Sequence, residues 1–128
     1  MAGKLSASAQ QRIALLEGYT ASVGRLNSLV EQYATVKTGH DNLNASIKRL
    51  ASQMKISFMG VGLDQMSQLC AAIEQTAARG SSPNQKARTL REHVGSLKFQ
   101  VELAIRTAIR EDEELRATQK TEKAKEQN

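Results

Sequence analysis

Residues 16–54, LEGYTASVGRLNSLVEQYATVKTGHDNLNASIKRLASQM, decide how this chain folds. Their apolar side chains recur at alternating intervals of three and four residues, the heptad pattern of a helix that packs lengthwise on another helix. The first part of this stripe, called here the first seam, consists of Leu16, Tyr19, Val23, Leu26, Val30 and Tyr33. The second seam consists of Val36, His40, Leu43, Ile47, Leu50 and Met54.

The two seams are out of step by three residues between Tyr33 and Val36. Such a slip is a stammer, which overwinds a coiled coil locally without ending it. No proline interrupts the stretch, although each of its three glycines costs roughly 1 kcal/mol of helix propensity relative to alanine. The pattern therefore predicts one helix from about Ser8 to Lys55, with Ser8 and Gln11 forming a capping box at its start.

A glycine-containing break, residues 56–62, follows this helix. Gly60 and Gly62 permit positive φ angles, so the chain is expected to reverse here. Phe58 and Met59 are predicted to plug the end of a bundle; the alternative is that this apolar loop is itself a docking site. A short second helix is expected next, ending at Arg79-Gly80, with a seam made of Leu63, Met66, Cys70, Ile73 and Ala77.

The start of the third helix is the best-defined boundary in the sequence. Ser82 is placed to cap it, Pro83 takes the first helical position, and Gln85 completes a capping box. Its seam consists of Ala87, Leu90, Val94, Leu97, Val101, Ala104 and Ala108. Phe99 and Leu103 lie on the opposite face, and a helix that is apolar on two sides is usually sandwiched between neighbours.

The ends of the chain carry no seam. Residues 1–7 have no pattern and are expected to be disordered. The acidic run 111–114 ends the apolar pattern, and residues 118–128 are expected to form a charged tail that is frayed or disordered. One helical bundle or coiled-coil domain, residues 8–117, lies between them.

The predicted fold is therefore all-α: an elongated antiparallel helical bundle or coiled coil with two long helices and a short middle helix. Short connections make consecutive helices antiparallel, so the third helix would run parallel to the first. A plain hairpin, with the second and third helices fused end to end, is the alternative. Because the middle helix is too short to cover its long neighbours, parts of both long seams would remain without an internal partner.

An uncovered apolar stripe marks an interface. The residues predicted to mediate self-association are Leu16, Tyr19, Val23, Leu26, Val30, Tyr33, Val101, Ile105 and Ile109. Phe99 and Leu103 are predicted to bind a separate neighbour, either another copy or a helical partner protein. A dimer or higher homo-oligomer is thus expected.

The net charge of +5 permits an acidic partner. Residues 1–59 and 83–110 each carry four more basic than acidic side chains. Weak, nonspecific nucleic-acid binding is the alternative function, because phosphate attraction needs no sequence motif. No aromatic residues are interleaved with the cations for base stacking. The candidate cations are Lys48, Arg49, Lys55, Lys86, Arg88, Arg91 and Lys98.

Nothing in the sequence indicates catalysis, a metal or a cofactor. His40 and His93 are far apart, and a polar residue within a seam more often sets helix register than catalyses. Cys70 lies on an apolar stripe, which favours an inert buried thiol over a reactive one. No signal peptide or membrane-spanning stretch is visible, so a reducing, cytoplasmic location is expected.

These features predict a non-enzymatic protein-interaction or scaffold subunit. It would act through helical self-association and through docking of helical partners.

Overall fold

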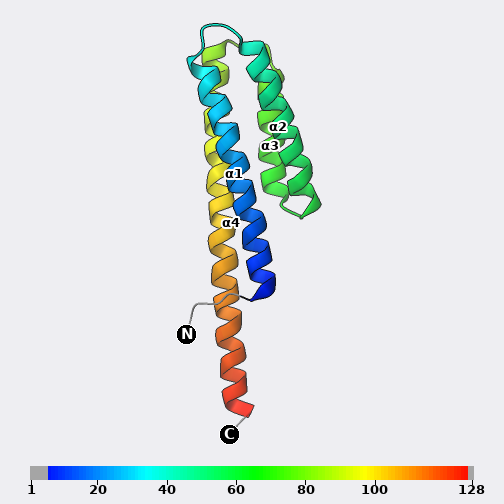
Figure 1. The fold of residues 1–128 in the computed structure, drawn as a ribbon, viewed down its shortest axis with the longest axis vertical. Helices are drawn as coiled ribbons and strands as arrows, with labels where there is room; N and C mark the ends of the chain where they lie inside the picture. Colours follow the sequence, from blue (N-terminus) through cyan, green and yellow to red (C-terminus); the bar gives the residue numbers. More distant parts are fainter. Residues whose placement is uncertain (1–5, 127–128) are drawn as a thin grey trace.

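The chain forms four helices and no strand over residues 6–126, the part that the computed structural model describes. They are α1 (Ala7–Thr35), α2 (His40–Gly60), α3 (Asp64–Ala78) and α4 (Pro83–Glu126). The all-α prediction is confirmed. Each helix runs antiparallel to the one before it, so the four form an up-down-up-down bundle (Figure 1).

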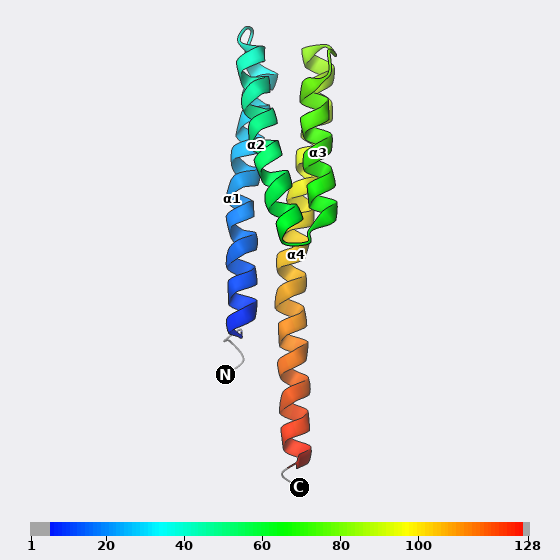
Figure 2. The same ribbon diagram turned by 90° about the vertical axis from the view of Figure 1, so that its right-hand side faces the viewer.

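The helices pack as two unequal pairs. α1 and α4 form a long pair, and α2 and α3 form a shorter hairpin that covers only part of it (Figure 2). The hairpin ends partway along α1, and α4 continues past both the hairpin and the start of α1 (Figure 1). Beyond the hairpin, α1 and α4 therefore pack only on each other, and the last part of α4 has no neighbouring helix.

The prediction of a single helix from Ser8 to Lys55 is wrong. The chain leaves the helix at Val36, whose φ of −73° and ψ of 149° are extended, and α2 begins after Gly39. Gly39 has a φ of 84°, a left-handed conformation that glycine adopts without a Cβ clash. The three-residue slip between the two seams thus marks the place where the chain reverses direction.

This extra reversal also changes the predicted topology. The chain has four helices rather than two long ones and a short middle one, and α4 runs antiparallel to α1 instead of parallel to it (Figure 1). The second and third predicted helices correspond to α3 and α4, and they are separate, as expected. The chain between α2 and α3 turns at Gly62, where φ is 76°.

The main core lies where all four helices meet. It is built from the two seams, the α3 stripe and the first half of α4, and its largest fully buried side chains include Leu26, Val30, Ile47, Phe58, Ile73, Leu90 and Leu97. A smaller cluster of Ile13, Leu16 and Ala108 joins α1 to α4 where the hairpin ends. The apolar periodicity that predicts the helices thus closes a core within one chain.

The corner between α2 and α3 is closed by Phe58, as predicted for this residue. Phe58 is fully buried, and its ring lies 4.3 Å, centroid to centroid, from the ring of Tyr19 on α1. The Leu63 N–H donates to the Phe58 carbonyl at 2.9 Å, which ends α2. Met59 does not share this role, because it is exposed.

The turn between α3 and α4 follows the sequence prediction closely. α4 begins at Pro83, and the Gln85 N–H donates to the Ser82 hydroxyl at 3.4 Å. α3 ends at Ala78 with Arg79 as its C-cap. Lys86 is buried and donates from Nζ to the Ala77 carbonyl at 3.0 Å, placing its charge at the negative end of the α3 dipole.

The start of α1 differs from the prediction by two residues. Ser6, not Ser8, is the N-cap, and its hydroxyl accepts the Ala9 N–H at 3.2 Å. Ser6 also ties this end of α1 to Asp112 on α4. The rest of the predicted disordered N-terminus, residues 1–5, lies outside the described residues, as do residues 127–128 of the predicted tail. The helical backbone continues past residue 117 to Glu126.

Candidate interaction surfaces

The residues predicted to mediate self-association lie mostly inside the bundle. Those that are buried are Leu16, Val23, Leu26, Val30, Tyr33 and Val101. Tyr19, Ile105 and Ile109 are partly buried and pack against the same two clusters. The idea that these seams lack an internal partner is therefore wrong, because α2 and α4 supply it. Self-association through these residues stays a prediction, but it is no longer supported by an uncovered seam.

Phe99 and Leu103 lie outside the core, on the side of α4 that the seam leaves free. Their exposed fractions are 54% and 41%. Burying such a side chain fully is worth roughly 1.5–3 kcal/mol, so their exposure favours a neighbour. Their role in partner binding stays a prediction.

An open groove runs between α1 and α4 beyond the hairpin. One depression of about 580 Å³ lies between Leu15 on α1 and Leu115 on α4. A second, of about 220 Å³, lies closer to the hairpin and is lined by Leu103 and by Met66 of α3. Arg12, Ala108 and Glu111 line both, so the two depressions form one groove that begins at the end of the hairpin.

The hairpin corner exposes a second set of apolar side chains. Ile56, Met59 and Val61 are all exposed there, and the exposed fraction of Met59 is 60%. This agrees with the alternative that the corner loop docks a partner, whereas Phe58 fills the core as a plug would. Docking of a partner at this corner stays a prediction.

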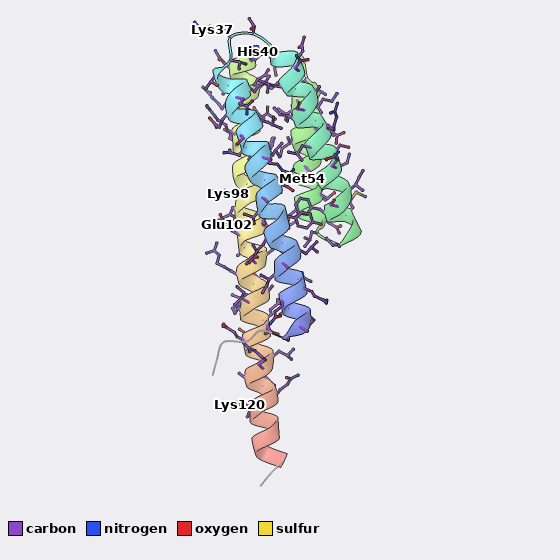
Figure 3. All side chains as sticks on the ribbon, viewed as in Figure 1. Lys37, His40, Met54, Lys98, Glu102 and Lys120 are labelled. Carbon is purple, nitrogen blue, oxygen red and sulfur yellow. The ribbon has the colours of Figure 1, made fainter. Side chains whose placement is uncertain are left out.

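The seven candidate nucleic-acid cations do not form one free patch. Lys55 pairs with Glu74 at 2.8 Å, Lys86 is buried at the end of α3, and Arg91 pairs with Glu31. The remaining four are exposed and make no ion pair with the described residues: Lys48, Arg49, Arg88 and Lys98. Lys98 lies one helical turn from Glu102 on α4 (Figure 3).

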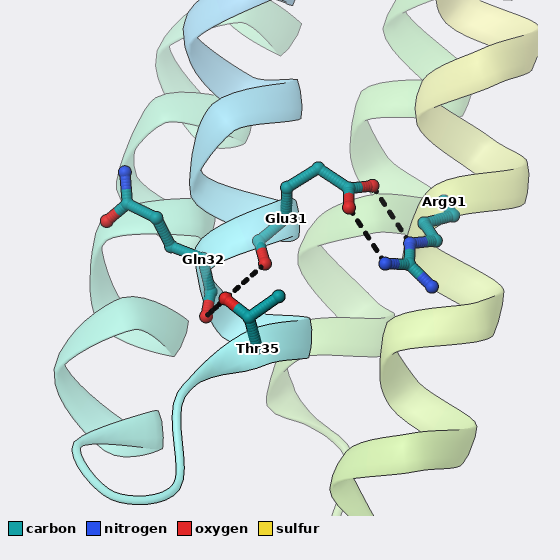
Figure 4. Close-up of polar contacts among 4 residues, drawn as sticks. All are labelled: Glu31, Gln32, Thr35 and Arg91. Atoms are coloured by element: carbon teal, nitrogen blue, oxygen red, sulfur yellow. Dashed lines mark hydrogen bonds and ion pairs between the residues drawn. The ribbon is translucent and has the colours of Figure 1, made fainter.

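The Glu31–Arg91 pair joins α1 to α4 near the chain reversal. Arg91 Nε donates to Glu31 Oε1 at 2.9 Å, and Nη2 donates to Oε2 at 2.8 Å (Figure 4). The hydrogen bonds from Arg91 hold the pKa of Glu31 below its ordinary value. Both side chains are about half exposed, so the pair orients the helices more than it stabilises them.

Asp112 anchors the start of α1. Its Oδ1 accepts the Ser6 hydroxyl at 2.6 Å, its Oδ2 accepts the Ser6 N–H at 3.2 Å, and Arg116 lies 3.2 Å from Oδ2. These contacts, the Ser6 hydroxyl first among them, lower the pKa of Asp112. They stabilise the fold above the ordinary carboxyl pKa, and this contribution is lost as pH falls through the lowered value.

We expect Ser6→Ala to raise the pKa of Asp112 towards the ordinary carboxyl value. The substitution removes the hydroxyl that stabilises the ionised form. NMR titration of the Asp112 carboxyl carbon in both proteins measures this shift, and Ser96→Ala, at an exposed serine of α4 far from Asp112, is the control. An identical titration in the parent and in Ser6→Ala would contradict the anchor.

Cys70 lies in the main core and is fully buried. Burial, with a smaller contribution from the Glu74 carboxylate, raises the pKa of its thiol to about 12. Since the thiolate is the reactive form, the folded protein holds this group inert.

A thiol reagent is therefore expected to label Cys70 only when the bundle opens. The labelling rate at neutral pH should be at least about a hundredfold below that of the denatured chain. Stopped-flow absorbance with a disulfide reagent, with and without denaturant, checks this. Labelling of the folded protein at the denatured rate would show that the core around α3 is open.

The histidines occupy structural positions. The His40 ring lies edge-on to Tyr33, 4.9 Å between centroids, where α2 meets the end of α1. His93 is partly buried on α4. Among the described residues, no group of three or more His, Cys, Asp or Glu side chains is arranged to hold a metal ion. In the same part of the chain, none of the helices has the length and hydropathy needed to cross a bilayer.

Two exposed apolar residues along the groove were missed from the sequence. Leu15 is adjacent to a seam residue, and Leu115 follows the acidic run, so neither belongs to a repeating pattern. The signal that would have found them is the length of the hairpin: residues beyond its reach on α1 and α4 cannot be covered.

Comparison with known protein families, with curated proteins and with solved structures finds no match to this chain. The proposals below therefore rest on the geometry and chemistry of its own residues.

Proposed function

We propose that this protein is a non-enzymatic helical interaction module that associates with itself and docks helical partners. The observation that carries the proposal is the open groove of α1 and α4 beyond the hairpin, with Leu15, Leu103 and Leu115 exposed along it. Where the hairpin is present, the same helix pair buries its inner face against two further helices.

Helices are the natural occupants of such a groove. Side chains of one helix fit between the ridges of another at an axial separation of about 8–10 Å. Arg12 and Glu111 border the groove and supply one charge of each sign. A partner helix with an apolar stripe flanked by charges would complete the layer that the hairpin begins.

The double change Leu15→Ser with Leu115→Ser is expected to weaken this association about tenfold or more, because each loses an apolar side chain from the contact. Sedimentation equilibrium over a range of protein concentrations measures the effect on self-association. The matched control is Ile56→Ser with Val61→Ser, which removes exposed apolar side chains from the hairpin corner instead.

Two results would count against the proposal. One is a single monomeric mass for the parent at every concentration, together with no binding of amphipathic helical peptides. The other is an equal loss of association in the groove and corner variants, which would indicate nonspecific hydrophobic association.

Nucleic-acid binding remains the alternative, with less support. Of the seven cations, Lys55, Lys86 and Arg91 are engaged within the protein. Binding that depends on the remaining cations should be weak and should decline steeply as salt rises. Titration of a labelled duplex at increasing salt tests it; tight, sequence-selective binding at physiological salt would make this the leading function.

A further inference from the structure

We propose that two copies of this chain form a dimer by exchanging α1, through straightening of the chain at residues 36–39 so that α1 and α2 become one helix. This inference rests on the self-association of the proposed function and adds a route to it that does not use the groove of α1 and α4. Each α1 would leave its own bundle and pack into the bundle of the other copy.

The closed turn has few contacts that hold it. Its left-handed residue, Gly39, has a φ of 84°, and α2 starts there without a side-chain cap. At the end of α1 the Val36 N–H donates to the Gln32 carbonyl, and the Thr35 hydroxyl donates to the Glu31 and Gln32 carbonyls (Figure 4). A continuous helix would keep these bonds, because each joins residues three or four apart. The Tyr33 and His40 rings meet edge to face across the turn, but this contact can be made equally well between two chains.

The sequence of the turn is compatible with a continuous helix. It contains no proline, and the seam passes through it: Tyr33, Val36, His40 and Leu43 are spaced three, four and three residues apart. The only irregularity is the three-residue stammer, which long coiled coils tolerate. The corner between α2 and α3 differs, because the core residue Phe58 and the next seam residue, Leu63, are five residues apart.

Exchange needs no new surface. An α1 from the second copy would meet the same core residues of α2 and α4, and the Glu31–Arg91 pair would form between chains. The reversal at residues 36–39 lies at the end of the bundle opposite to the projecting part of α4 (Figure 1). Two bundles would therefore stack end to end at their turns, with their α4 ends pointing outward.

Deletion of residues 37–39 is the most direct variant. It removes the residues that reverse the chain and brings Val30, Tyr33, His40, Leu43 and Ile47 to an unbroken three-four spacing. The deleted chain is expected to be a stable dimer with helix content per chain close to that of the parent. A folded monomer would overturn the proposal.

Gly39→Ala tests the same equilibrium without a deletion. Alanine is disfavoured at the positive φ of the closed turn and favoured in a continuous helix, so the dimer fraction should rise about tenfold or more. An added Cβ at Gly39 meets nothing within 4 Å, so the φ angle alone opposes it. Gly62→Ala is the matched control, since it also has a positive φ and open space but no continuing seam. Equal effects of the two variants would overturn the proposal.

Lys37→Pro provides the opposite bias. Proline breaks a continuous helix, and the extended conformation of Val36 suits the residue before a proline. Added to Gly39→Ala, it should return the chain to a monomer. A dimer that persists in the double variant would show that α1 and α2 need not be continuous, and would overturn the proposed route.

Chemical cross-linking identifies which helix is exchanged. In a Cys70→Ser background, chains with Glu31→Cys and chains with Arg91→Cys are refolded together and treated with a short bismaleimide. Exchange predicts a cross-link between the two kinds of chain, in the dimer fraction only. A dimer without this cross-link would overturn the exchange and leave the proposed function standing, whereas the absence of any dimer from the parent and its variants would count against both.

Discussion

Leu26→Asp is expected to unfold the isolated chain rather than merely to weaken an assembly. Leu26 has an exposed fraction of 0% and belongs to the core in which all four helices meet. The change removes its packing and places a carboxyl group in apolar surroundings, a cost of roughly 4 kcal/mol or more. Such a loss is comparable to the whole stability of many domains, about 5–15 kcal/mol.

Chemical denaturation followed by circular dichroism measures this effect. Asn27→Asp is the control, because the neighbouring residue is exposed and the same charge there remains in water. A Leu26→Asp protein that is as stable as the parent, at concentrations where both are monomers, would show that the first seam is not internal.

Phe58→Ala should destabilise the fold by about 3–5 kcal/mol, because it leaves a large cavity where the hairpin meets α1. Phe58 is fully buried and contacts the Tyr19 ring, and the Tyr19 hydroxyl donates to the neighbouring Ser57 carbonyl at 3.2 Å. The loss would therefore act where the hairpin is fixed to the long pair.

Met59→Ala is the matched control for that change. Met59 is the next residue along α2 and is exposed, so its truncation should change the free energy of unfolding by less than about 0.5 kcal/mol. Thermal melts of the two variants make the comparison. Equal losses would mean that the two residues do not divide between core and surface as described.

The sequence predicts helices and caps well where the signal is local. Ser82, Pro83 and Gln85 place the start of α4 correctly, because a capping box and an N-terminal proline act within one turn. The core face of α4 also follows from apolar spacing, since Leu90, Val94, Leu97 and Val101 are all buried.

The reversal at residues 36–39 could not be predicted in the same way. A three-residue slip fits either an overwound continuous helix or a turn, and no residue there except Gly39 strongly disfavours a helix. The form that is adopted depends on whether packing of α1 on α2 and α4 of its own chain stabilises the protein more than a continuous helix would. That is a tertiary effect, and heptad counting does not contain it.

The candidate cations show a similar limit. Net charge and clustering place Lys55, Lys86 and Arg91 in a basic patch, whereas the fold brings Glu74, the Ala77 carbonyl and Glu31 to them. Their partners come from other helices, between 9 and 60 residues away in the chain. Sequence clustering of charge is therefore a poor guide to free charge when helices pack side by side.

One chain turns at residues 36–39 and closes its own bundle. The distance between spin labels on Thr20→Cys and Ser57→Cys, in a Cys70→Ser background and diluted with unlabelled protein, measures this reversal. At low protein concentration this distance should be short, because the two residues lie on adjacent helices packed about 10 Å apart. A distance of roughly 55 Å for the monomer, the length of a continuous helix between the labels, would contradict it.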